Sequence, residues 1–218
     1  MNYKTLKARQ RKERDKHPES LALRVHRTLS WLDAAERADK DWDARFVFLW
    51  IAFNAAYAEE IRGGSDRAGE KSTFRQFVDR LVELDGKGLL SQLVWQEYPK
   101  SIRTLIENPY VFPAFWSWQS GDLTEAGWTE KFEKANRFAI KALEHGNTAA
   151  VLSVALNRIY TLRNQILHGG ATWNSSVNRA QVRDCARIMG QLVPVIISIL
   201  MDHPHEDWPA AAWPVVKP

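Results

Sequence analysis

Apolar residues recur at intervals of three and four along most of this chain, which is the spacing that one buried face of an α-helix requires. The amphipathic segments are residues 19–38, 74–84, 122–144, 148–168 and 176–201. No segment alternates apolar and polar residues long enough to predict a β-strand. The sequence therefore predicts an all-α protein, built from helices that pack through their apolar faces.

The segment from Trp42 to Glu60 differs from the other predicted helices. Its run Phe46–Phe53 is apolar on every side, so we expect this helix at the centre of the fold with neighbours on several sides. Asn54 interrupts the apolar surface directly afterwards. Because a buried amide needs hydrogen-bond partners, Asn54 either finds them within the fold or points toward a functional cleft.

Breaks in the helical pattern set the expected domain organisation of the 218 residues. Residues 1–18 are predicted to form a basic N-terminal arm, residues 19–202 a single helical domain, and residues 203–218 a C-terminal tail. Within the domain, residues 86–124 contain short apolar pieces separated by prolines. We expect this region to be a long, partly irregular helical insertion into a simpler bundle.

Aromatic residues are abundant, and ten tryptophans imply a bulky core or a large apolar interface. Four of the aromatic residues cluster within the expected insertion: Phe112, Phe115, Trp116 and Trp118. Such a cluster either stacks nucleic-acid bases or packs inside the fold, and a run between prolines favours packing.

The net charge of +4 is distributed unevenly along the chain. Residues 1–16 carry seven basic and two acidic side chains, a net of +5, so the remaining residues sum to −1. An arm of this kind is suited to contact nucleic-acid phosphates. The candidate RNA-binding residues are Lys4, Lys7, Arg9, Arg11 and Lys12. The alternative is a solvated, partly disordered tail or a frayed helix.

Several protein classes are not expected. The charged N-terminus lacks the apolar core of a secretory signal, and the longest apolar stretches (46–53 and 192–201) fall short of the roughly 20 residues of a membrane span. The single cysteine, Cys185, cannot form an intramolecular disulfide or a cysteine-based metal site. His203 and His205 lack a third ligand at useful spacing. We expect a soluble, cytoplasmic protein with no metal, no other cofactor and no membrane partner.

The chemically distinctive stretch is Arg163–His168, which contains Asn164 and is followed by Gly169–Gly170. On an ideal helix Arg163 and His168 differ by about 140° around the axis, whereas Asn164 and His168 share a face. A glycine pair at this place is typical of a helix C-cap, so His168 should lie in the last turn. The sequence thus predicts a titratable side chain beside a permanent cation at the edge of the fold.

These side chains suit the cleavage of RNA through its own 2′-hydroxyl. That reaction needs a base for the hydroxyl proton, an acid for the leaving 5′-oxygen, and a cation for the charged phosphoryl intermediate. Histidine acts as base or acid near neutral pH, and the planar fork of arginine matches phosphate oxygens. One histidine does not conveniently fill both roles, so two copies of the chain would complete the set.

The pattern Arg163-Asn164, with His168 four positions later, in the penultimate helix of a bundle resembles the signature of the HEPN superfamily (higher eukaryotes and prokaryotes nucleotide-binding). The apolar helix that carries Asn54 is similar to the core helix of bacterial HEPN proteins of the defence and toxin type. The resemblance covers roughly residues 19–60 and 126–202. It implies an HEPN-like helical bundle.

The resemblance also implies a function: a metal-independent endoribonuclease, active as a homodimer, in phage defence or a toxin–antitoxin system. Arg163 and His168 would be catalytic, and Asn164 would orient the histidine or the phosphate. RNA and an antitoxin or regulatory protein would be partners, and the products would carry 2′,3′-cyclic phosphates. In HEPN toxins controlled by nucleotidyltransferase modification a tyrosine stands two positions after the histidine, whereas this chain has Gly170.

Two other hypotheses stay open at this point. A non-catalytic HEPN-like helical module would bind RNA, nucleotide or a partner protein without turnover. A structural dimerisation domain would use its tryptophans for packing alone. In both cases Arg163 would be a surface residue and His168 would only cap its helix.

Overall fold

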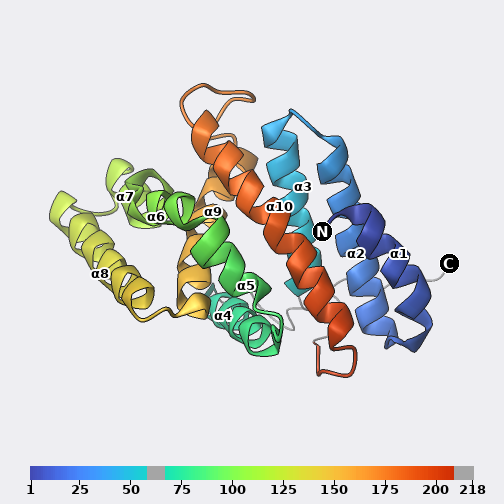
Figure 1. The fold of residues 1–218 in the computed structure, drawn as a ribbon. Helices are drawn as coiled ribbons and strands as arrows, with labels where there is room; N and C mark the ends of the chain where they lie inside the picture. Colours follow the sequence, from blue (N-terminus) through green and yellow to red (C-terminus); the bar gives the residue numbers. More distant parts are fainter. Residues whose placement is uncertain (58–66, 209–218) are drawn as a thin grey trace. The chain divides into compact units, whose positions relative to one another are not determined.

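The computed structural model describes residues 1–57 and 67–208, with the backbone alone for residues 67–73. The described part contains ten α-helices with short 3₁₀ and π-helical turns and no β-strand (Figure 1). This confirms the predicted all-α class. The segment predicted to be helical from Trp42 to Glu60 is helical to Tyr57, and residues 58–60 lie outside the described residues.

The chain folds into two compact units, one formed by residues 1–87 together with the chain from residue 185 onward, the other by residues 88–184. This differs from the predicted single domain over 19–202. The boundary lies close to the expected start of the insertion at residue 86. The second unit nevertheless continues to Asp184, because the short helices that follow residue 88 pack with α8 and α9 into one core.

The first unit is organised around α3. Phe46, Trp50 and Phe53 of this helix are each at most 1% exposed, as expected for a helix that is apolar on every side. A Cβ atom built at Gly190 of α10 would lie 3.8 Å from Leu49, so α3 and α10 approach closely there. The helices of this unit are α1 (Tyr3–Glu13), α2 (Glu19–Arg37), α3 (Trp42–Tyr57), α4 (Arg67–Leu84) and the part of α10 (Arg179–Asp202) from Cys185 onward.

The N-terminal residues form a packed helix, which corrects the prediction of a basic arm over 1–18 and also its alternative of a solvated tail. Asn2 caps α1 by accepting from the backbone N–H of Thr5 at 3.0 Å. Leu6 is 3% exposed and α1 packs on α2. Arg9 forms an ion pair with Asp202 of α10 at 2.8 Å. The prediction of an arm rested on the charges of residues 1–16 and did not consider Leu6, whose buried side chain anchors α1 on the unit.

The described part of the C-terminal tail is an ordered loop. Nε2 of His203 lies 2.9 Å from the carbonyl oxygen of Leu84 at the end of α4. The indole N–H of Trp208 donates to the carbonyl of His203 at 2.8 Å, and Trp208 is 8% exposed. Residues 209–218 of the expected tail lie outside the described residues.

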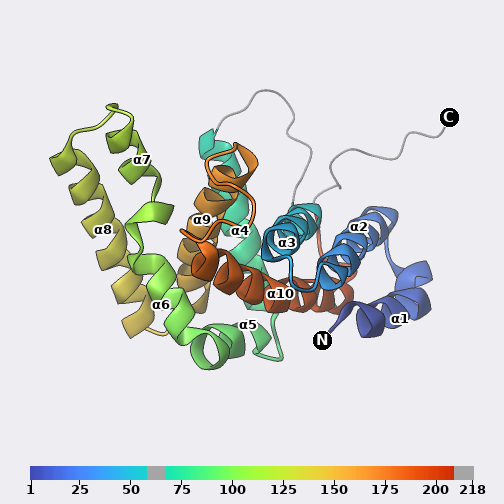
Figure 2. The ribbon, with the colours of Figure 1, turned by 90° about the horizontal axis from the view of Figure 1, so that it is seen from above.

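In the second unit, short helices precede two long ones. Prolines occupy the first positions of α6, the 3₁₀ turn and α7, where the missing N–H is not needed. Figure 2 shows α7 and α8 side by side. The elements are α5 (Leu89–Gln92), a π-helical turn (Leu93–Glu97), α6 (Pro99–Glu107), a 3₁₀ turn (Pro109–Val111), α7 (Pro113–Gln119), α8 (Glu125–Glu144), α9 (Thr148–Leu167) and the first residues of α10.

Two local features of this unit involve α8. The N-cap of α8 is Thr124, whose hydroxyl accepts from the N–H of Gly127 at 3.1 Å. The aromatic cluster of the expected insertion packs against α8: Trp118 stacks on Trp128 with ring centroids 5.5 Å apart, and Phe115 meets Trp128 edge to face at 5.2 Å. These contacts are those of a packed cluster.

Within the described residues, α10 is the one helix long and apolar enough to cross a membrane. The apolar window of this helix is 78% buried in the protein. Core helices of soluble proteins pass the same test of length and composition, so the helix is weak support for a membrane location.

Candidate functional site

The C-terminal end of α9 passes from core to surface within two turns. Ile159 and Leu162 are fully buried, whereas His168, the C-cap residue, is exposed. Gly169 has φ +74°, and its N–H donates to the carbonyl of Ile166, while the N–H of Gly170 donates to that of Gln165 at 2.7 Å. These two bonds form a Schellman motif, which confirms the predicted C-cap and fixes the chain direction after His168.

Arg163 and Asn164 interact directly. Nη1 of Arg163 donates to Oδ1 of Asn164 at 2.8 Å. The guanidinium also lies 6.0 Å from the ring centroid of Tyr160, one turn earlier on the same helix. Nε of Arg163 is buried and has no acceptor within the described part of the chain. The side chain of Asn164 therefore orients the arginine, whereas the resemblance implied that it would orient the histidine or the phosphate.

His168 projects separately from this pair. Its backbone N–H donates to the carbonyl of Asn164 at 3.0 Å, which closes the last helical turn. Among the described residues its imidazole makes no hydrogen bond, and none joins it to Arg163. One copy of the chain thus carries the guanidinium and the imidazole on one helix end, with no hydrogen bond between them among the described residues.

The stretch of sequence that carries the motif is rich in arginine. Residues 145–183 contain four arginines and no aspartate or glutamate: Arg158, Arg163, Arg179 and Arg183. Cations attract phosphate groups over distances of about a Debye length, although Nε of Arg183 also lies 3.6 Å from Asp184, directly after this stretch. The charge balance of residues 1–16 gives no sign of this stretch. Counting acidic residues along the chain would have found it.

Large apolar side chains are exposed around the same helix end. Tyr160 is 37% exposed, Leu167 44% and Trp173, in the loop between α9 and α10, 74%. Tyr160, Asn164 and Leu167 follow one another at helical spacing and so share a face of α9. Gln165 attaches the helix to the 3₁₀ turn, because its Nε2 donates to the carbonyl of Tyr110 at 2.6 Å. The sequence analysis did not single out Trp173.

The five cations expected to bind RNA lie on α1, in the other unit. Arg9 is engaged with Glu13 and Asp202, both at 2.8 Å. Burial, with the nearby charges of Arg11 and Arg14, lowers the pKa of Lys7. The remaining cations, Lys4, Arg11 and Lys12, are exposed. Three of the five are therefore displayed to solvent on one well-formed helix.

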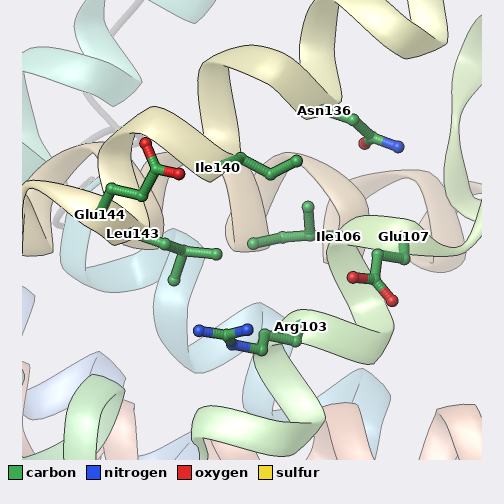
Figure 3. A pocket seen from close by; sticks show the side chains of 7 residues that line it. All are labelled: Arg103, Ile106, Glu107, Asn136, Ile140, Leu143 and Glu144. Atoms are coloured by element: carbon green, nitrogen blue, oxygen red, sulfur yellow. The ribbon is translucent and has the colours of Figure 1, made fainter.

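A small cavity lies elsewhere in the second unit, between α6 and α8 (Figure 3). Its volume is about 220 Å³, and the side chains of Ile106 and Leu143 point into it. Arg103 and two glutamates stand around it, so it has no single charge preference. The seven lining residues are Arg103, Ile106, Glu107, Asn136, Ile140, Leu143 and Glu144. None belongs to the motif on α9.

Arg158 is the buried counterpart of Arg163 on α9. It is 3% exposed, and its guanidinium lies 4.4 Å from the ring centroid of Phe112 and 5.3 Å from that of Phe132. Nη2 donates to the carbonyl of Ile106 at 3.1 Å. Burial lowers the pKa of Arg158 to about 10. This arginine is held by rings and a carbonyl, so its role is in packing.

Two further expectations concern polar groups. Oδ1 of Asn54 is buried and has no hydrogen-bond partner among the described residues. In the same part of the chain, no three His, Cys, Asp or Glu side chains are grouped closely enough to hold a metal ion.

Comparison with protein-family models, curated protein sequences and solved structures found no match to this chain.

Proposed function

We propose that this protein is a metal-independent endoribonuclease of the HEPN type, with Arg163, Asn164 and His168 as its working residues. The observation that carries the proposal is the end of α9, where a guanidinium oriented by Asn164 and an exposed imidazole follow a buried helix. The acid-free, arginine-containing stretch around them supports a polyanionic substrate. The all-helical fold is compatible with the family resemblance of the motif.

In the proposed reaction the 2′-oxygen of a ribose attacks the adjacent phosphorus and the bond to the 5′-oxygen breaks. The histidine of one copy accepts the 2′-hydroxyl proton, and that of the second copy donates a proton to the leaving 5′-oxygen. Arg163 stabilises the charge on the phosphoryl oxygens. The products are a 2′,3′-cyclic phosphate and a 5′-hydroxyl. Two copies are needed because the imidazole of one chain cannot be base and acid in the same step.

We place this activity in the cytoplasm, in phage defence or a toxin–antitoxin system, with a homodimer as the active form and an antitoxin or regulatory protein as a partner. A ribonuclease that cuts any accessible single strand would need such control to spare cellular RNA. The growth of cells that express wild-type protein should stop, and the growth of cells that express His168→Ala should continue.

The direct test is cleavage of single-stranded RNA by purified protein in EDTA, with analysis of product ends. Arg163→Ala and His168→Ala should each lower the cleavage rate constant by about 10³-fold, because each removes a group that acts in the transition state. His145→Ala is the matched control, since His145 is also an exposed C-cap residue, at the end of α8. Wild-type cleavage by both motif variants would falsify the proposal.

A non-catalytic RNA-binding module is the second candidate. The lack of a hydrogen bond between Arg163 and His168 within the described part of the chain favours it, because a single chain does not join the pair. RNA binding that survives both substitutions, with no cleavage by the wild-type dimer, would support this candidate instead.

A further inference from the structure

The loop between α9 and α10 displays an aromatic ring a short distance along the chain from the motif. This loop, drawn in orange at the top of Figure 1, extends beyond the end of α9. Trp173 is 74% exposed in it, and Val177 is 95% exposed. Tryptophan is highly buried on average in folded proteins, so a ring exposed to this extent is unusual and is accessible to a partner.

The position of Trp173 is constrained from both ends of the loop. On the α9 side, the Schellman bonds of Gly169 and Gly170 fix how the chain leaves His168. On the α10 side, Nε of Arg179 donates to the carbonyl of Ser175 at 3.3 Å. Trp173 is five positions after His168, so their Cα atoms lie at most ~18 Å apart. The ring is therefore within a few nucleotides of any phosphate bound at His168.

The arginines that flank Trp173 in the sequence favour a negatively charged partner. Arg163 precedes the loop, and Arg179 and Arg183 follow it. The first acidic residue after the loop is Asp184, which lies 3.6 Å from Nε of Arg183. Cations that track a phosphate backbone, combined with an exposed aromatic ring, are the features with which proteins hold single-stranded nucleic acid. An RNA strand offers both complements, negative phosphates for the arginines and a flat base for the indole.

We infer that Trp173 stacks on an unpaired base of the RNA, next to the phosphate held at the end of α9. This inference rests on the proposed function, since it takes the bound strand to be the substrate. Stacking of this kind accepts any base but requires that the base be free of a duplex. Trp173 would therefore make the protein selective for single-stranded RNA without making it selective for a sequence.

The experiment measures binding of a labelled single-stranded oligoribonucleotide by fluorescence anisotropy, with full-length His168→Ala protein in EDTA. Adding Trp173→Ala should raise Kd by about 10-fold, and Trp173→Tyr should restore most of the affinity. Phe138→Ala is the matched control, because Phe138 is 49% exposed on α8 of the same unit. Thermal melting verifies that each variant is folded.

Abasic substitution identifies the stacked base directly. An oligonucleotide with one base removed at successive positions should lose affinity for the parent protein at one position by about 10-fold. At that position Trp173→Ala protein should bind the intact and abasic strands equally. An abasic profile that is unchanged by Trp173→Ala would overturn the inference.

The outcomes separate this inference from the proposed function. Base-dependent binding through Trp173 by a wild-type protein that never cleaves would retain the inference and reject the ribonuclease. Cleavage by a wild-type protein whose affinity does not depend on Trp173 would do the reverse. If Trp173→Ala dissociates a dimer in sedimentation experiments while the abasic profile stays the same, the loop is a protein interface and the inference fails.

Discussion

Arg158 and Arg163 stand five residues apart on α9 and have opposite environments. The guanidinium of Arg158 is enclosed by Phe112 and Phe132, and burial lowers its pKa to about 10. The guanidinium of Arg163 is half-buried and is held by the side-chain oxygen of Asn164. One arginine is part of the core of its unit, and the other is presented at a helix end beside exposed aromatic rings.

The difference shows that residue type and charge do not identify a working residue by themselves. Arg158 lies where ring faces and a backbone carbonyl replace water around the cation. Arg163 is half-buried, and its hydrogen bond to Asn164 leaves other N–H groups of the guanidinium available for a phosphate. The same contrast separates Arg9, which is engaged by two carboxylates, from the exposed Arg11 on α1.

The largest expected effect is on stability. Arg158→Ala should lower the free energy of unfolding by roughly 3 kcal/mol, because it removes two ring contacts and leaves a cavity. Arg163→Ala should lower it by less than ~1 kcal/mol. Urea unfolding of the two variants measures the difference. Arg158→Met, which keeps the volume without a buried charge, should lose less than Arg158→Ala. Equal losses for the two alanine variants would remove the distinction between the arginines.

The second prediction concerns the chemistry of the exposed arginine. Arg163→Lys should lower the cleavage rate constant by about 10- to 100-fold, because an ammonium cannot replace the two-pronged contact of a guanidinium with phosphate. Its unfolding free energy should stay within ~0.5 kcal/mol of wild type. Single-turnover cleavage in EDTA measures the rate, and full activity of this variant would show that only the charge of Arg163 matters.

The turn after His168 gives a third, smaller effect. Gly169→Ala should lower the unfolding free energy by about 1 kcal/mol, because alanine is strained at φ +74° although there is space for its methyl group. It should also reduce cleavage, since the chain direction beyond His168 would change. Gly146→Ala, at φ +63° after α8, is the matched control with a similar stability cost. Loss of cleavage in both variants would point to a general effect of stability.

The smallest effect is expected for Asp202, which forms ion pairs with Arg9 and Lys87. Burial would raise the pKa of Asp202, but Lys87 and Arg9 lower it below its ordinary value. The folded state therefore binds fewer protons than the unfolded state, so the stabilisation is present above about pH 4 and is lost as the pH falls through the lowered pKa. Asp202→Asn should cost less than about 1 kcal/mol at pH 7. The difference in unfolding free energy between wild type and Asp202→Asn, measured with urea, should become smaller in acid. A difference that does not change with pH would contradict the lowered pKa of Asp202.

Much of the fold could be predicted from periodicity. α2 and α9 begin and end within a residue of their predicted bounds, because apolar repeats and caps are local signals. The division into two units was not predicted, since it depends on which short helices between residues 88 and 119 pack with α8 and α9. Leu6 shows the same limit: one apolar residue in a basic helix decides that the N-terminus is packed.

The sequence alone determined that the chain is helical, that one helix ends at His168, and that an arginine, an amide and a histidine stand within its last two turns. These properties follow from local spacing and from the glycine pair. Only the tertiary structure decided that Arg158 is buried while Arg163 is presented, that Asn164 holds the guanidinium, and that Trp173 is exposed. Burial depends on neighbours that are distant along the chain, and no local pattern contains them.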